Sequence, residues 1–284
     1  MLKKLSKFLK GQFLFLTTTT VILTVGLTEQ SAQSAVLALS DENSIAAFDT
    51  SSSDPGNSGL IFWTVDDINH LFQSQFWYRV GSTSGENPIN NLNLIGLNQT
   101  QLTSNMLTVS YAGAGFEIEL NYRLNGGKPG RGHSSLLENI EIKNTSSNPL
   151  DFHLFKYTDF DLTDNGQQDT TKIGYGMATQ FDNFTLATEV IKPSASYYQV
   201  AAFPDILNAL TDNLPTTLTN FPTTLTGENS YAFQWSFDLE PETFFSITNY
   251  TSIKPVPEAT ITLGWFIGSA GLGLFWRFRR DRVS

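Results

Sequence analysis

Residues 107–124 read Leu-Thr-Val-Ser-Tyr-Ala-Gly-Ala-Gly-Phe-Glu-Ile-Glu-Leu-Asn-Tyr-Arg-Leu. Apolar and polar residues alternate through 107–111 and again through 116–124, and the glycine-containing turn 112–115 separates the two runs. A period of two turns one side of a strand toward a dry interior and the other side toward water. The segment therefore predicts an antiparallel β-hairpin that covers one side of a hydrophobic core.

The same period continues along the chain in both directions. The clearest single strand is 231–239, and in 150–162 apolar residues fall on both parities, which predicts a central strand covered on both faces. Helical spacing is convincing only at 204–213. The sequence therefore predicts an all-β fold, a large antiparallel β-sandwich with one short helix. Further strands are expected at 44–50, 136–144, 172–177, 184–190, 197–202 and 244–250.

The start of the chain departs from this pattern. Four lysines within the first ten residues precede the mostly apolar stretch 13–27 and then the small residues of 31–35. This order predicts a secretory signal peptide, to which we assign residues 1–38, and makes an N-terminal membrane anchor the less favoured reading. The triplets 32–34 and 36–38 both suit cleavage by signal peptidase.

The C-terminal end has three parts in a fixed order. A Pro/Glu element around Pro257 is followed by the uncharged apolar run 259–276 and then by four arginines. As a helix, this run would rise about 27 Å, which is close to the roughly 30 Å of the hydrocarbon core. The run therefore predicts a transmembrane helix, and the arginines stop transfer and keep the C-terminus cytoplasmic. These arginines are Arg277, Arg279, Arg280 and Arg282.

This tripartite order resembles the PEP-CTERM sorting signal, which exosortases process in bacteria that have an outer membrane and an exopolysaccharide matrix. The family motif Val-Pro-Glu-Pro matches Val256, Pro257 and Glu258, and Ala259 stands where the family has proline. The resemblance implies that residues 255–284 form a sorting segment, that an exosortase-like enzyme processes it, and that the body then reaches the cell surface or the medium. On topology rules alone the segment is an ordinary membrane anchor, and that alternative stays open.

The exported body is strongly acidic. The two ends carry eight of the 17 Lys and Arg residues and three of the 27 Asp and Glu residues, so residues 39–256 keep nine basic and 24 acidic side chains, a net charge of −15. Such a surface repels nucleic acid, and we expect no nucleic-acid partner. Because the chain has no cysteine, the predicted domain 39–254 must be stable through its core alone, for which its length is sufficient.

The body carries two looser resemblances. The hairpin 140–152 is similar to hairpins of large carbohydrate-associated β-sandwich domains, the supersandwich type. The body as a whole resembles a group of uncharacterised exported β-proteins with the same type of tail, and that group implies no activity. The segments that carry this second resemblance are 63–66, 70–73, 76–81 and 157–161.

One acidic segment has the spacing of a calcium loop. Counted from Asp161, oxygen ligands fall at positions 1, 3 and 5, glycine at position 6 and another acid at position 9. Lys172 stands at position 12, where an EF-hand has a bidentate glutamate. The segment therefore predicts either a calcium-binding turn between strands or a solvated acidic turn. Its candidate ligands are Asp159, Asp161, Thr163, Asn165 and Asp169.

Aromatic residues near an arginine form a second candidate site. Aromatic faces beside a guanidinium suit sugar rings and cations. A sandwich of this size also needs aromatic side chains to fill its core, and this is the interpretation that we favour. The candidate carbohydrate contacts are Trp63, Phe76, Trp77, Tyr78, Arg79 and Trp235.

The sequence gives little support for a catalytic site. The three histidines lie in different segments without a nucleophile-elbow or zincin motif, and His153 is expected on the polar face of a strand. The pairs Glu117/Glu119 and Glu138/Glu141 are explained by alternation on a wet face, so no glycosidase pair and no catalytic residue is named.

We therefore expect a non-enzymatic protein of the envelope or extracellular matrix. Its expected partners are the secretion machinery, an exosortase-like enzyme, the membrane through the C-terminal helix, and an extracellular polysaccharide. No cofactor is required, apart from the calcium ion that the acidic segment would hold. The alternatives are a carbohydrate-active enzyme on the same scaffold and a permanently anchored surface protein.

Overall fold

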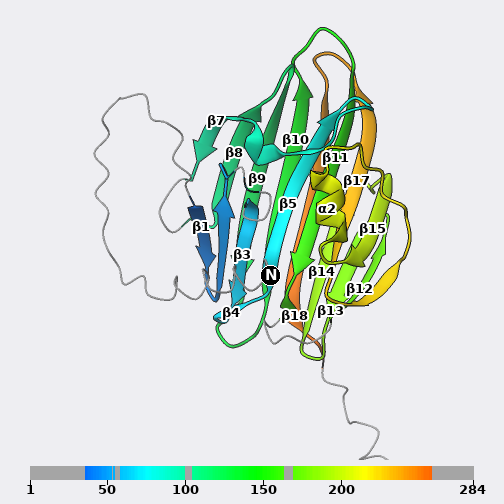
Figure 1. Ribbon diagram of the computed structural model, residues 1–284. Helices are drawn as coiled ribbons and strands as arrows, with labels where there is room; N and C mark the ends of the chain where they lie inside the picture. Colours follow the sequence, from blue (N-terminus) through cyan, green and yellow to red (C-terminus); the bar gives the residue numbers. More distant parts are fainter. Residues whose placement is uncertain (1–35, 53, 55–57, 100–103, 163–168, 258–284) are drawn as a thin grey trace, which may run out of the picture. The chain divides into compact units, whose positions relative to one another are not determined.

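Figure 1 shows the computed structural model of the chain. The structure describes residues 36–52, 54, 58–99, 104–162 and 169–257, which belong to one compact unit. Within these ranges no helix is long and apolar enough to cross a bilayer. The predicted transmembrane helix 259–276, the four arginines after it and most of the predicted signal peptide lie outside the described residues.

The first sheet, sheet A, is antiparallel and follows the order β1-β2-β3-β5-β11-β17-β15, with β4 beside β3 and β6 beside β5. Its strand β11, Leu150–Phe160, pairs with β5 on one side and with β17 on the other. The remaining strands of sheet A are β1 Val36–Asp41, β2 Ser44–Asp49, β3 Gly59–Val65, β4 Ile68–Asn69, β5 Leu71–Val80, β6 Asn87–Pro88, β15 Tyr197–Ala202 and β17 Asn229–Leu239.

The second sheet, sheet B, is also antiparallel and follows the order β16-β12-β13-β14-β18-β10-β9-β8-β7. The predicted hairpin 107–124 forms its strands β8 and β9. The strands of sheet B are β7 Asn93–Asn98, β8 Met106–Ala112, β9 Phe116–Gly126, β10 Ser134–Asn144, β12 Asp169–Gly174, β13 Met177–Phe181, β14 Thr185–Lys192, β16 Thr224–Gly227 and β18 Phe244–Pro255. The helices of the described part are the 3₁₀ turn η2, Ile89–Asn91, and α2, Asp205–Thr211.

The main hydrophobic core lies between the two sheets. Val109 and Ile118 of the predicted hairpin are each 1% exposed, and they belong to the same apolar cluster as Phe152 and Leu154 of β11. The dry face of the hairpin is therefore the face that sequence alternation indicated. The prediction of an all-β antiparallel sandwich with one short α-helix is confirmed for the described residues.

The face of sheet A that turns away from sheet B, called here the outer face of sheet A, is partly covered as well. The helix α2 lies beside β15 and β17 (Figure 1), and with the loop after it buries a second apolar cluster. This cluster joins Ile206, Leu210 and Leu218 to Trp77 and Phe155 of the sheet. The prediction that the strand at 150–162 is covered on both faces is therefore confirmed.

Two strand boundaries differ from expectation. The predicted strand 172–177 is split between β12 and β13, because Tyr175 and Gly176 form a turn between them. The last strand, β18, continues to Pro255 and pairs with β14 up to that residue. Residues 251–255, beyond the end of the expected strand 244–250, are therefore part of sheet B.

The first strand bears on the predicted signal peptide. β1 begins at Val36 and pairs with β2 over its whole length, and Leu39 of β1 is fully buried. Residues 36–38 thus contribute to sheet A. Cleavage at the first of the two predicted triplets, residues 32–34, leaves this strand intact, and cleavage after Ala38 removes half of it.

A charged cluster lies in the core between the sheets. The Nζ of Lys156 is 2.7 Å from Oε1 of Glu138, and these side chains are 2% and 3% exposed. The Nδ2 of Asn249 donates to Glu138 and also to Glu189, which accepts a 2.6 Å hydrogen bond from the hydroxyl of Tyr231 as well. The expectation that Glu138 lies on a wet face is wrong, because it shares the dry parity of its strand and is stabilised there by Lys156.

Candidate functional site

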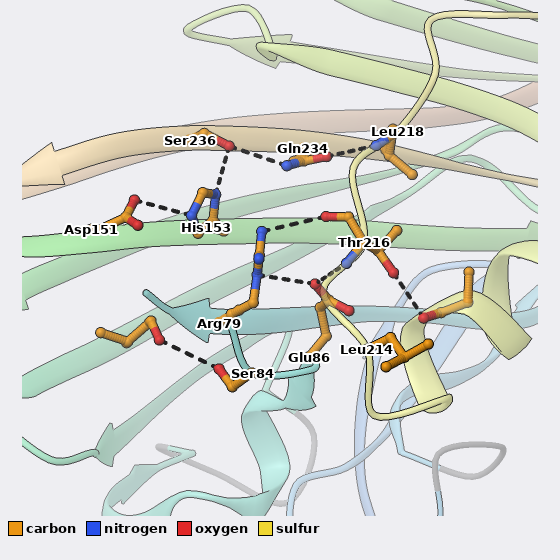
Figure 2. Close-up of polar contacts among 12 residues, drawn as sticks. Arg79, Ser84, Glu86, Asp151, His153, Leu214, Thr216, Leu218, Gln234 and Ser236 are labelled. Atoms are coloured by element: carbon orange, nitrogen blue, oxygen red, sulfur yellow. Dashed lines mark hydrogen bonds and ion pairs between the residues drawn. The ribbon is translucent and has the colours of Figure 1, made fainter. Parts of the chain in front are cut away.

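Three neighbouring strands of sheet A bring polar side chains together at one end of the outer face. The register places His153 of β11 opposite Arg79 of β5 and opposite Ser236 of β17. Residues directly opposite one another on adjacent strands share a face of the sheet, so these three side chains project to the same side. Figure 2 shows this group, which we call the outer-face site and define as Arg79, Glu86, Asp151, His153, Gln234 and Ser236.

His153 is held between a hydroxyl and a carboxylate. Its Nδ1 lies 2.8 Å from Oγ of Ser236, and its Nε2 lies 3.0 Å from Oδ1 of Asp151. Burial and, next, the positive charge of Arg79 lower the pKa of His153, against the opposing effect of Asp151. The imidazole is therefore neutral at neutral pH, and a proton on Nε2, facing the carboxylate, leaves Nδ1 to accept from Ser236.

Gln234 gives this chain of contacts its direction. Its Oε1 accepts a 2.9 Å hydrogen bond from the backbone N–H of Leu218, so its Nε2 faces Ser236 and donates to Oγ at 3.1 Å. The hydrogen bonds then run in one direction, from Gln234 through Ser236 to His153, and the other ring nitrogen of His153 faces the carboxylate of Asp151 (Figure 2). Such a chain fixes the orientation of the imidazole and of the hydroxyl.

A buried ion pair supports the site from one side. The Nε of Arg79 lies 3.2 Å from Oε1 of Glu86, and the two side chains are 4% and 0% exposed. The same loop residue, Thr216, donates its N–H to Glu86 at 2.9 Å and accepts from Nη2 of Arg79 at 3.4 Å. Burial raises the pKa of Glu86, although the N–H of Thr216 and the charge of Arg79 act in the opposite direction. The pair ties the loop after α2 to the face of the sheet.

The accessible part of the site is a strip of hydrogen-bonding groups. The side chain of Asp151 is 48% exposed and that of His153 is 14% exposed. Ser196 is exposed beside them, and its Oγ accepts a 3.3 Å hydrogen bond from the N–H of Ser236. The carboxylate and the neutral imidazole on β11, with the hydroxyls of Ser236 on β17 and of Ser196 just before β15, are suited to bind the hydroxyl groups of a polar ligand.

The aromatic candidates from the sequence are buried. Trp63, Phe76 and Trp235 lie in the core between the sheets and are 1%, 4% and 2% exposed, and Trp77 is 1% exposed under α2 on the opposite face. Tyr78 is half-buried against Phe152. These burials agree with core filling, the interpretation favoured from the sequence. Of the six candidate carbohydrate contacts, the structure places Arg79 in the outer-face site.

The calcium candidates are only partly described, since Thr163 and Asn165 lie outside the described residues. Asp159 is fully buried in β11 and Asp161 is partly exposed just after it. Asp169 is 6% exposed at the start of β12. Among the described residues no group of three or more His, Asp or Glu side chains is arranged to hold a metal ion.

Asp169 is nevertheless in an unusual environment for a carboxylate. Its Oδ2 accepts from Nε2 of Gln180 at 2.8 Å and from the N–H of Leu162 at 3.4 Å. Burial raises the pKa of Asp169 to about 6, and the negative charges of Asp182 and Asp161 add to the shift. The side chain is therefore sensitive to pH in the neutral range.

Sequence reasoning missed the grouping of His153 with Ser236. Strand alternation was enough to put Asp151 and His153 on one face of the strand. The partner hydroxyl, however, is 83 residues farther along the chain, and only the register of β11 with β17 brings it opposite. A single sequence holds no signal for that register.

The fold is shared with known carbohydrate-active enzymes. A bacterial glucoamylase, solved with acarbose, matches with a TM-score of 0.56 at 10% identity, over 84% of this chain and 35% of its own. A putative aldose 1-epimerase from Escherichia coli K12 matches with a TM-score of 0.52 at 9% identity, over 78% of this chain and 99% of its own. A galactose mutarotase related enzyme from Lactobacillus acidophilus has a TM-score of 0.51 at 10% identity, over 80% of this chain and 99% of its own.

The present chain thus spans about a third of the glucoamylase and nearly the whole of the two smaller enzymes. No protein-family model matches the sequence. No curated protein matches it either. Identities near a tenth establish a likeness of fold and leave residue roles to the geometry of this chain. The chain is an all-β protein whose two-sheet architecture is similar to that of enzymes that act on sugars.

Proposed function

We propose that this protein is an exported component of the bacterial envelope or extracellular matrix that binds saccharide through the outer-face site. The body is proposed to be of the supersandwich type. The observation that carries the proposal is the directional hydrogen-bond chain Gln234–Ser236–His153, with the exposed carboxylate of Asp151 3.0 Å from Nε2 of His153, at an accessible end of the sheet. It supplies donors and acceptors in fixed positions, which suits recognition of hydroxyl edges.

The proposed route to the cell surface uses the two ends of the chain. The signal peptide exports the body, and the segment from Val256 to Arg282 holds it at the membrane until an exosortase-like enzyme cuts near Glu258. The predicted processing motif begins directly after β18, which ends at Pro255, and the N–H of Val256 still donates to the backbone oxygen of Phe184. A permanently anchored surface protein is the outcome if no cleavage occurs.

A glycan array probed with the purified full-length chain tests saccharide binding. His153→Gln and Ser236→Ala are expected to lower the affinity for the best neutral oligosaccharide by about tenfold each, which equals about 1.4 kcal/mol. His133→Gln and Ser246→Ala are matched controls, because both residues are exposed and lie outside the site. If the wild-type chain binds no glycan, or if the controls weaken binding as much as the site variants do, the proposal is wrong.

A second candidate function is catalysis on a sugar, and one observation favours it. A neutral histidine between a carboxylate and a hydroxyl is able to take up and return a proton at Nδ1. Turnover of an oligosaccharide or interconversion of sugar anomers by the wild-type chain, lost in His153→Gln, would establish the enzyme. Binding without turnover at full occupancy would establish the binding protein.

A further inference from the structure

The outer face of sheet B, which turns away from sheet A, carries an ordered pattern of side chains. The strand registers bring one residue from each of six adjacent strands into a single row perpendicular to the strands. We call this row the stripe, and from β13 to β8 it consists of Met177, Val190, Tyr250, Leu137, Arg123 and Met106.

The stripe is apolar and accessible. Met177, Tyr250 and Met106 are 50%, 45% and 53% exposed, and Leu137 and Val190 are half-buried between them. Neighbouring strands lie about 4.8 Å apart, so the five steps from β13 to β8 extend over about 24 Å. Large exposed apolar side chains in a line, here interrupted by Arg123, are typical of a surface that binds a partner.

Polar rows run along both sides of the stripe. Two residues away along the strands on one side, the register aligns four hydroxyl residues, Thr179, Thr188, Ser252 and Ser135. On the other side it aligns hydroxyls with amides, Thr248, Asn139, Asn121 and Thr108. An apolar line between two lines of hydrogen-bonding groups matches a chain of sugar rings, whose C–H faces are apolar and whose edges carry hydroxyls.

The charges of this region are unlike those of the body. The stripe and its two flanking rows include no Asp or Glu, although acids outnumber bases by 24 to nine in residues 39–256. They include Arg123, and the same registers add Lys172 and Lys192 at the ends of the flanking rows, all three exposed. The carboxylates Glu119 and Glu141 lie one row farther out on this face, and Glu119 accepts a 2.8 Å hydrogen bond from Nδ2 of Asn121 in the flanking row. The stripe and its flanking rows together thus form a locally positive band on an acidic protein.

We propose that the stripe binds a linear anionic polysaccharide, such as a polymer of uronic acids, lying across the strands of sheet B. Tyr250 and Leu137 contact the sugar faces, the flanking rows bind hydroxyl groups, and Arg123, Lys172 and Lys192 contact carboxylates of the polymer. This inference goes beyond the outer-face site, because it uses the opposite sheet and a different class of ligand. A neutral polysaccharide, an anionic membrane and a second copy of the chain are the competing occupants.

Binding of the full-length chain to polygalacturonate tests the proposal, with dextran and fully methyl-esterified polygalacturonate as neutral polymers. Tyr250→Ala is expected to weaken binding about tenfold, which equals about 1.4 kcal/mol. Phe244→Ala is its matched control, because Phe244 lies on the same strand, projects from the same face and is 64% exposed outside the stripe. Equal effects of the two substitutions would overturn the assignment of the stripe.

The charge component has its own test. The double variant Arg123→Gln/Lys192→Gln is expected to bind polygalacturonate more weakly and with a smaller dependence on salt. Lys143→Gln is the control, because Lys143 is an exposed cation of the same face outside the stripe, and it is expected to change neither the affinity nor its salt dependence. Equal binding of the esterified polymer would overturn the anionic ligand. Equal binding to vesicles of anionic lipid, or a dimer in light scattering that Tyr250→Ala dissociates, would assign the stripe to another occupant and overturn the proposal.

The proposals for the outer-face site and for the stripe can be refuted separately. If His153→Gln abolishes binding of a neutral oligosaccharide and Tyr250→Ala leaves polygalacturonate binding unchanged, the outer-face site stands and the stripe does not. The opposite pattern would retain the stripe and reject the outer-face site.

Discussion

Replacing Lys156 by methionine tests the account of the buried charged cluster. The side chain is 2% exposed, its Nζ is 2.7 Å from Glu138, and it lies 4.4 Å from the centre of the Phe76 ring. Methionine keeps most of the apolar stem, so the change removes a charge and leaves only a small cavity. Two carboxylates, Glu138 and Glu189, then share Asn249 in a dry interior without a cation.

The expected cost follows from that arrangement. Removing one partner of a buried ion pair destabilises a protein by about 3–5 kcal/mol. For a domain of this size about 1 kcal/mol lowers the melting temperature by about 2–4 °C, so the variant should melt about 6–20 °C below the wild type. Lys143→Met is the control, since Lys143 is 47% exposed and lies 3.9 Å from Glu242, and such surface pairs contribute about 0–1 kcal/mol.

The dependence on pH distinguishes a charge effect from a packing effect. Burial raises the pKa of Glu189 in the folded protein, and removal of Lys156 raises it further because this cation opposes the shift. A carboxyl whose folded-state pKa is raised contributes stability below its unfolded pKa, and this contribution is lost as the pH rises through the folded value. The loss in Lys156→Met should therefore be larger at pH 8 than at pH 5. A loss below 2 °C, or one that does not change with pH, would refute the reasoning.

Three further predictions concern the acidic segment and the tail. The wild type should lose about 2 kcal/mol of stability relative to Asp169→Asn as the pH rises from 4 to 8, because the folded-state pKa of Asp169, about 6, lies above its unfolded value. Urea unfolding measures this difference. The same difference in unfolding free energy at pH 4 and at pH 8 would contradict the prediction. Millimolar calcium should raise the melting temperature of the wild type but not that of Asp161→Ala. If neither calcium nor EDTA alters the melting curve of the wild type, the segment is a solvated acidic turn without a calcium site. Replacing Pro257 and Glu258 by alanine should leave uncut protein in the membrane fraction of a host with the matching exosortase, and release as efficient as that of the wild type would identify the tail as an ordinary anchor.

Periodicity in the sequence was sufficient for the sandwich and for many of its strands, but the strands between residues 59 and 98 were not assigned individually. The hairpin at 107–124 was predictable because each of its strands has one dry and one wet face, and 150–162 was identifiable as central because Phe155 interrupts the alternation. The split of 172–177 was missed because Gly174 and Gly176, which favour a turn, were assigned to a strand with their apolar neighbours. Propensity alone does not determine where a strand reverses.

The candidate sites were less predictable than the fold. The stripe on sheet B and the pairing of His153 with Ser236 both depend on strand register, which no local pattern encodes. Glu138 was placed on the wrong face because acids were assumed to avoid a dry parity, and its partner Lys156 comes from the other sheet. Trp63 and Trp235 were correctly favoured as core residues, since large aromatic side chains fill the space between two large sheets.

Backbone amide shifts of the labelled full-length chain, recorded while the best neutral oligosaccharide is added, test the proposed saccharide site most directly. We expect the largest changes on residues 151–154 of β11 and 234–237 of β17, around His153 and Ser236, and we expect Ser236→Ala to remove them. Changes confined to other parts of the described structure, or saturation of the chain with no change in these two segments, would contradict it.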